Sequence, residues 1–142
     1  MPAIPDDVRD RHDAPLGRTA ARFAALAAVS GMIAVASGAF ATHALRATLE
    51  PSRLATFETA ARQQAIHALA LIAVAWGCDR LGGRILGAAG WLFVAGTVVF
   101  CGSLYTLALG GPRGFGALAP VGGLCLIAGW LLTAIGLSRS AR

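Results

Sequence analysis

The chain has 142 residues, of which 56% are hydrophobic and only 13% are charged, and its mean hydropathy is +0.67. A typical soluble domain carries about 25% charged residues, so the composition excludes a disordered chain and argues against a soluble domain. The length allows one compact unit, because domains usually hold about 100–200 residues.

The net charge of +5 and the pI of 10.5 raise the question of nucleic-acid binding. That function needs basic side chains massed on one water-facing surface, whereas the basic residues here are all arginines that stand singly between long apolar runs. We therefore expect no nucleic-acid partner. The cysteines form no CxxC pair and have no nearby histidine at zinc spacing, so no metal site is expected at Cys78, Cys101 or Cys125.

Residues 1–22 are polar, with three prolines and a mixed run of aspartates and arginines. Such a segment cannot bury enough apolar surface to offset the entropy of ordering, and it is predicted to be a disordered tail, with a second short tail at residues 139–142. The uncharged run from Phe23 to Leu45 is longer than the h-region of about 7–15 residues in a signal peptide. It is therefore predicted to remain as a membrane helix.

Residues 23–138 are predicted to form one transmembrane domain. About 20 apolar residues cross the hydrocarbon core of roughly 30 Å, and three runs reach that length alone. The other run, Gln63–Cys78, would cover only about 24 Å. It reaches a full span only if the helix begins at Pro51 and includes Glu58 and Arg62, whose i,i+4 spacing places them on one face, where they can pair. The expected helices cover residues of about 23–45, 51–78, 85–110 and 119–138.

The fold class expected is an all-α integral membrane protein whose four transmembrane helices form an up-down-up-down bundle. In that threading, eight arginines lie on the side of both termini and four lie on the other side. Positively charged residues concentrate on the cytoplasmic side of membrane proteins, so both termini are predicted to be cytoplasmic, in a bacterial inner membrane. Close helix contacts are expected along small residues spaced by four, namely Ser30, Ala34 and Gly38, Gly83 and Gly87, and Ala119 and Gly123.

The same threading gathers the unusual polar side chains at the outer mouth of the bundle. Ionisable groups at membrane depth indicate function by default, although at a rim water also reaches them. At 100° per residue, Glu58 and Arg62 share one side of the second helix, while Gln63 and His67 share nearly the opposite side. Which pair faces the interior is left open. The candidate binding residues are His43, Glu58, Arg62, His67 and Tyr105.

Each candidate also has a structural interpretation. Glu58 and Arg62 can form an interfacial ion pair that ends the apolar span. His67 can bond to another helix, bind a ligand, or ligate a metal or haem. His43 can be stabilised by the dipole at a helix C-terminus, and Tyr105 can belong to an interfacial aromatic belt.

Several segments resemble domain-of-unknown-function family 423, whose members are small four-helix inner-membrane proteins similar to transmembrane protein 256 of animal mitochondria. The resemblance covers about Phe23 to Ser138 and implies the same architecture, without an activity to carry over. The chain departs from the family pattern at Ala41, Thr42, Gln63 and Ile66. The matching segments are Gly38–Leu45, Phe57–Ala70, Gly102–Tyr105, Pro120–Gly123 and Ala128–Trp130.

Three functions remain open from the sequence. The first is a non-enzymatic membrane module that assembles with itself or with another integral membrane protein. The second is a binder or conduit for a small polar solute, an ion or a lipid headgroup at the outer mouth, and the third is a redox subunit that binds haem through His43 and His67. The sequence carries no GxSxG, HExxH or P-loop motif, so no catalytic residue, no enzymatic activity and no resident cofactor are expected.

Overall fold

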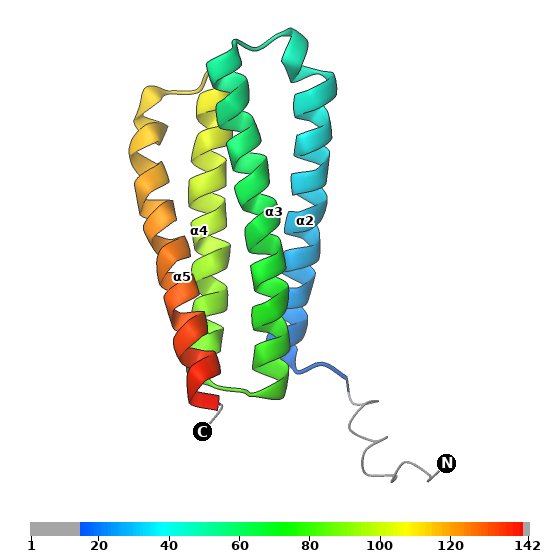
Figure 1. Ribbon diagram of the computed structural model, residues 1–142, viewed down its shortest axis with the longest axis vertical. Helices are drawn as coiled ribbons and strands as arrows, with labels where there is room; N and C mark the ends of the chain where they lie inside the picture. The colour runs from blue at the N-terminus through cyan, green and yellow to red at the C-terminus, as the bar shows by residue number, and fades with distance from the viewer. Residues whose placement is uncertain (1–14, 141–142) are drawn as a thin grey trace, which may run out of the picture.

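The computed structural model describes residues 15–140 of the chain, so most of the expected N-terminal tail and residues 141–142 lie outside the described residues. Four long helices follow one another in alternating directions and run almost the whole length of the molecule (Figure 1). Short 3-10 turns at Leu45–Ala47 and Arg113–Ala117 lie in the two connections at one end. The four helices are α2 (Arg18–His43), α3 (Pro51–Arg80), α4 (Arg84–Ala108) and α5 (Leu118–Ser140).

Within residues 15–140, three helical segments are long and apolar enough to cross a membrane, namely Arg18–Ala47, Arg84–Ala108 and Arg113–Arg139. Most of their residues lie on the surface of the molecule, with at most 33% of any apolar window buried. This exposure is expected where lipid, rather than water, surrounds the helices. α3 is less apolar over its length because its first half carries Arg53, Glu58 and Arg62.

The helix ends are fixed by polar contacts between neighbouring helices. At one end, the backbone N–H of Gly17 donates to the Asp79 carboxylate at 3.0 Å, which satisfies one of the free N–H groups that precede a helix. α2 accordingly begins at Arg18, before the predicted start at Phe23. At the other end, the Arg53 guanidinium donates to the Ala108 carbonyl at 2.8 Å, where α4 ends.

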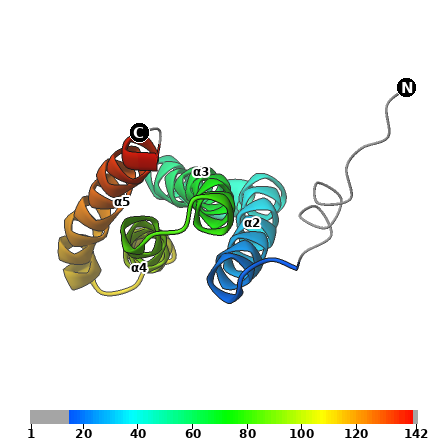
Figure 2. The ribbon, with the colours of Figure 1, turned by 90° about the horizontal axis from the view of Figure 1, so that it is seen from below.

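The helices form an open row in which α3 and α4 are the inner members (Figure 2). α2 packs along α3, α3 along α4, and α4 along α5, while α2 contacts α4 only slightly and α3 contacts α5 only slightly. Within residues 15–140, α2 and α5 do not meet, so the expected bundle does not close around a shared centre. The buried core therefore consists of the interfaces between neighbouring helices, which we call seams.

The α4–α5 seam is built from glycines spaced by seven residues, which places them on one helix face. The large residue opposite each glycine is so close that a Cβ atom would fall 2.8 Å from the side chain at Gly129, 2.7 Å from it at Gly136, and 2.4 Å from the backbone nitrogen at Gly122. Leu126 of α5 packs in the same way over Gly96 of α4. The three pairs are Gly122 with Phe100, Gly129 with Phe93, and Gly136 with Leu86.

The glycines of the predicted spacing of four do not make such close contacts, although Ala34 of that pattern is buried. A Cβ atom at Gly38 or Gly87 would meet nothing within 4 Å, and one at Gly123 would make an ordinary contact with Phe100 at 3.7 Å. On α2 the buried small residues also recur every seven positions and face α3, as in a left-handed pair of helices. They are Ala20, Ala27, Ala34 and Ala41.

Candidate functional site

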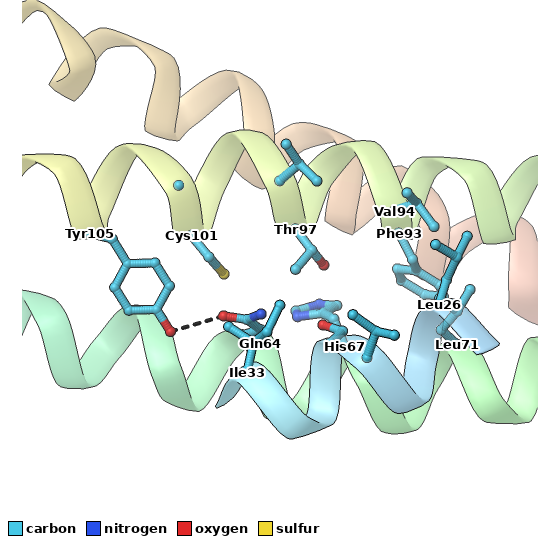
Figure 3. Close-up of a pocket in the computed structure, with 14 residues that line it drawn as sticks. Leu26, Ile33, Gln64, His67, Leu71, Phe93, Val94, Thr97, Cys101 and Tyr105 are labelled. Carbon is cyan, nitrogen blue, oxygen red and sulfur yellow. Dashed lines mark hydrogen bonds between the residues drawn. The ribbon is translucent and has the colours of Figure 1, made fainter. Parts of the chain in front are cut away.

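A cavity of about 320 Å³ lies between α2, α3 and α4, at the point where the open row leaves α2 and α4 apart (Figure 3). Ser30, His67 and Thr97 each lie about midway along their helices, so the cavity is near the middle of the molecule's long axis. Its walls are mainly apolar. The lining residues are Leu26, Val29, Ser30, Ile33, Gln64, His67, Leu71, Phe93, Val94, Thr97, Val98, Cys101, Gly102 and Tyr105.

Gln64 is the central polar side chain of this cavity and is 7% exposed. The Tyr105 hydroxyl of α4 donates to its Oε1 at 2.9 Å, so the amide oxygen is turned toward Tyr105. The amide nitrogen is turned the other way, into the cavity (Figure 3), and within the described chain it has no hydrogen-bond partner. Gln64 therefore presents two N–H donors to whatever occupies the space.

His67 forms part of the same wall, but both of its ring nitrogens are already engaged. Nδ1 lies 2.8 Å from the Gln63 carbonyl oxygen, and the Trp130 indole N–H of α5 donates to Nε2 at 3.3 Å. An indole N–H can only donate and a carbonyl can only accept, so the ring is neutral with its proton on Nδ1. His67, which is 6% exposed, thus links α3 to α5 beside the Phe93 ring, whose centre is 5.6 Å away.

Thr97 supplies a second free polar group. Its hydroxyl points into the cavity (Figure 3), and it makes no hydrogen bond among residues 15–140. By contrast, Thr106 of the same helix and Thr133 of α5 each donate to the carbonyl four residues earlier at 2.8 Å. Thr97 is therefore available to a ligand in a way that these two threonines are not.

The cavity opens sideways between α2 and α4. Val29, Ile33 and Val98 line it and are 51%, 43% and 68% exposed. These side chains face the surroundings of the helices and not the helix ends. The cavity is therefore reached from the side of the helices, between α2 and α4.

Glu58 and Arg62 lie elsewhere, beside a shallow hollow between α2 and α3. Both side chains are exposed, and no ion pair joins them in the part of the chain that the structure describes. The sequence therefore predicted correctly that they share one face of α3, but not that they form no ion pair. The other residues of this hollow are small or short: Ala34, Gly38, Thr42 and Ala61.

The structure thus divides the predicted site. His67 and Tyr105 come together around the cavity, Glu58 and Arg62 border the second hollow, and His43 is exposed at the last residue of α2. His67 lies on the interior face of α3, whereas Glu58 and Arg62 are exposed. The sequence alone had left open which of these two sides of the helix faces the interior.

Sequence reasoning missed Gln64, Ser30 and Thr97. Gln64 precedes His67 by three residues and Leu71 by seven, so the interior face of α3 was readable from the i, i+3, i+7 spacing. The two hydroxyls had no such signal, because serine and threonine in apolar helices usually bond to their own backbone.

The histidines do not form a haem-binding pair. Haem ligation needs a free imidazole nitrogen, and His67 has none, while His43 lies at the end of α2, about half a helix length away. Among the described residues, no group of three His, Cys, Asp or Glu side chains is placed to hold a metal ion.

A family model described as "Protein of unknown function (DUF423)" matches residues 37–123, more than half of the chain. The chain belongs to this family. The match confirms the resemblance drawn from the sequence motifs, and it covers α3 and α4 in full, together with the end of α2 and the beginning of α5.

Curated relatives agree with the family match. UPF0382 inner membrane protein YgdD of Escherichia coli is 41% identical over 119 residues, which cover 82% of this chain and 88% of the relative. UPF0382 membrane protein YwdK of Bacillus subtilis is 36% identical over 80% of this chain and 93% of its own length. A UPF0382 membrane protein of Staphylococcus saprophyticus is 40% identical over 80% and 94%. No solved structure matches the chain.

Proposed function

We propose that this protein is a four-span inner-membrane protein that holds a small ligand in the cavity between α2, α3 and α4. The observation that carries the proposal is the Gln64 amide, which is buried midway along the helices and turns its unpartnered nitrogen into a space of about 320 Å³. Ligand pockets of proteins commonly begin at about 300 Å³ and are mostly apolar with a few placed polar groups.

The fourth span is α3. Its charged residues lie in the part up to Arg62 and in the last two residues, Asp79 and Arg80, and the stretch from Gln63 to Cys78 carries none. α3 also packs between α2 and α4, and short connections join it to both. A helix held along two membrane spans must cross the bilayer with them, and the Arg53 and Arg62 side chains can reach the interface with their charged ends.

A ligand is expected because free polar groups are costly at this depth. An amide or hydroxyl without a hydrogen-bond partner loses several kcal/mol in hydrocarbon, and no water from the bilayer core can replace the partner. Gln64 and Thr97 are both in this position. A bound molecule that accepts their hydrogen bonds would remove the cost.

Filling the cavity tests the proposal. Gly102 of α4 lines the cavity, and a Cβ atom there would meet nothing within 4 Å. Gly102→Phe should therefore occupy the cavity without displacing a helix. Gly87→Phe is the matched control, because Gly87 lies on the same helix with equally open space but does not line the cavity.

Both variants and the wild-type protein would be purified from native membranes in mild detergent and examined by native mass spectrometry. We expect a bound small molecule on the wild type and on Gly87→Phe that is absent from Gly102→Phe. A molecule retained equally by all three, or by none, would contradict a ligand in this cavity. Gly102→Leu repeats the comparison if Gly102→Phe does not accumulate.

Assembly with itself or with another integral membrane protein is the second candidate, and the open row favours it. α2 and α5 are edge helices that each have one main neighbour among the described helices, so each has a free side where a further helix can pack. Crosslinking in native membranes from cysteines placed at Val35 and Leu131, which are 75% and 60% exposed on these edges, should capture a defined partner. If crosslinks formed only within single chains, and none joined two chains, this role would be excluded.

A further inference from the structure

We infer that the ligand of the α2–α3–α4 cavity is a neutral lipophilic molecule that carries a carbonyl oxygen. The inference rests on the proposed function and names the chemistry that the cavity recognises. It follows from three properties of the lining: its lack of charge, the direction of its free donors and the direction from which it opens.

The cavity has no charged side chain among the described residues that line it. A charged ligand in a mainly apolar site would therefore lose its hydration without gaining a counter-ion, which costs far more than moving a neutral group. His67 does not change this balance, since its neutral form is fixed by Gln63 and Trp130. Carboxylates, phosphates and ammonium groups are excluded on this ground.

Each free polar group that meets in the cavity can donate, since the Gln64 amide and the Ser30 and Thr97 hydroxyls all carry a donor hydrogen. The Gln64 nitrogen can only donate, and its direction is set by the Tyr105 hydroxyl, which holds the amide oxygen on the opposite side. The Thr97 hydroxyl faces the same space from α4 and can donate as well. One carbonyl oxygen has two lone pairs, so it can accept from both groups at once.

The rest of the lining suits a hydrocarbon body. Leu26, Leu71 and Phe93 close one end of the cavity, while Val29 and Val98 border the opening toward the surrounding bilayer. A molecule that enters from lipid must itself dissolve in lipid. Its apolar part then lies against these residues and its oxygen points toward Gln64 and Thr97.

Three probes with one carbon skeleton test this specificity: menthone, which has the carbonyl; menthane, which lacks it; and menthylamine, which is a cation at neutral pH. Each would be added to purified protein in the same detergent, and binding would be followed by the shift in thermal unfolding, because a ligand that binds the folded state raises the midpoint. We expect menthone to bind more tightly than menthane and menthylamine not to bind.

Thr97→Val removes the free hydroxyl with little change in shape, and Thr106→Val is its control on the same helix, since Thr106 bonds to the Gly102 carbonyl. We expect Thr97→Val to weaken menthone binding by about tenfold at most, the value of one hydrogen bond, and to leave menthane unchanged. Thr106→Val should keep the menthone preference. The paired change of Gln64→Met with Tyr105→Phe removes the amide donors without orphaning the tyrosine, and should reduce the preference for menthone to the part that the Thr97 hydroxyl supplies.

The outcomes separate the two claims. If menthone and menthane bind equally and Gly102→Phe abolishes both, the cavity binds ligands but the carbonyl inference is wrong. If menthylamine binds best, the exclusion of charge is wrong. If Gly102→Phe binds every probe as the wild type does, the proposed function fails and the carbonyl inference fails with it.

Discussion

The His67 ring is held by two hydrogen bonds of fixed direction, one to its own helix and one from α5. Trp130→Phe keeps an aromatic ring but removes the indole N–H, so Nε2 is left without its donor. We expect the free energy of unfolding to fall by about 0.5–1.5 kcal/mol, the usual net value of such a bond. The measurement is reversible unfolding in mixed micelles.

The control for that change is Trp76→Phe, because Trp76 is 58% exposed and lies away from His67. Nitrogen NMR of the His67 ring gives a second test. The proton should reside on Nδ1 in both proteins, because the Gln63 carbonyl is retained, but the Nε2 resonance should shift in Trp130→Phe, where its donor is lost. Equal losses of stability in both tryptophan variants, with the Nε2 resonance unchanged, would contradict the hydrogen bond from Trp130.

Glu58 and Arg62 lead to the prediction that two neighbouring side chains do not interact. Their i,i+4 spacing predicts an ion pair, yet both side chains are exposed and unpaired in the described chain. Glu58→Gln and Arg62→Gln should therefore act independently, and the double variant should equal their sum within about 0.3–0.5 kcal/mol. A larger coupling in a double-mutant cycle of unfolding free energies would show that the pair forms in the membrane.

Spacing along one helix fixed the face that these two residues share, but not their contacts. The same holds for Gln64, whose interior position follows from its spacing with His67, whereas its bond to Tyr105 depends on how α3 and α4 are aligned. Residue-level predictions from the sequence were reliable where one helix decides the outcome. They were incomplete where a second helix supplies the partner.

At the scale of the helices, two adjacent glycines of α5 differ in how closely they approach α4. A Cβ atom at Gly122 would lie 2.4 Å from the Phe100 backbone nitrogen, whereas one at Gly123 would lie 3.7 Å from the Phe100 ring. Backbone cannot move aside as a side chain can. Gly122→Ala should therefore separate α4 from α5 and lower the free energy of unfolding by about 1–3 kcal/mol, as overpacking does.

Gly123→Ala is the control for this prediction. It should be neutral, or stabilise the protein by up to about 1 kcal/mol, because alanine favours the helix over glycine. Both variants would be compared by unfolding in the same micelles. If Gly123→Ala proved the more damaging of the two, the register of the α4–α5 seam would be wrong.

The sequence alone did not reveal this seam, because the chain has 18 glycines and several of them recur at a spacing of four. What selects Gly122, Gly129 and Gly136 is the matching series of large side chains on α4. That match depends on antiparallel alignment of two helices, which a pattern within one helix does not contain. The existence of the helices was readable from apolar length, but their pairing was not.

At the scale of the whole molecule, apolar run lengths predicted the long helices and left their lateral order undetermined. An up-down-up-down bundle was expected, and the structure has four alternating helices arranged as an open row. The cavity follows from that difference, since α2 and α4 flank α3 without closing over it. A compact bundle of the same helices would have joined α2 to α5 and given another set of interior residues.

The number and direction of the crossings give the last prediction. The connections after α2 and after α4 lie at one end of the molecule, and the α3–α4 turn lies at the other end with the two ends of the described chain (Figure 1). Single cysteines at Ala47, Leu81 and Gly114, in a protein with Cys78, Cys101 and Cys125 replaced by serine, report these three connections.

Intact cells would be treated with a membrane-impermeant maleimide. We expect labelling at Ala47 and Gly114, while Leu81 should react only after the inner membrane is opened, because the eight arginines on the side of the termini favour the cytoplasm over the four on the other side. Labelling of Ala47 and Leu81 from the same side would mean that α3 does not cross, and the cavity would lose its place at the middle of the bilayer. Labelling of Leu81 alone would keep four crossings and reverse the orientation.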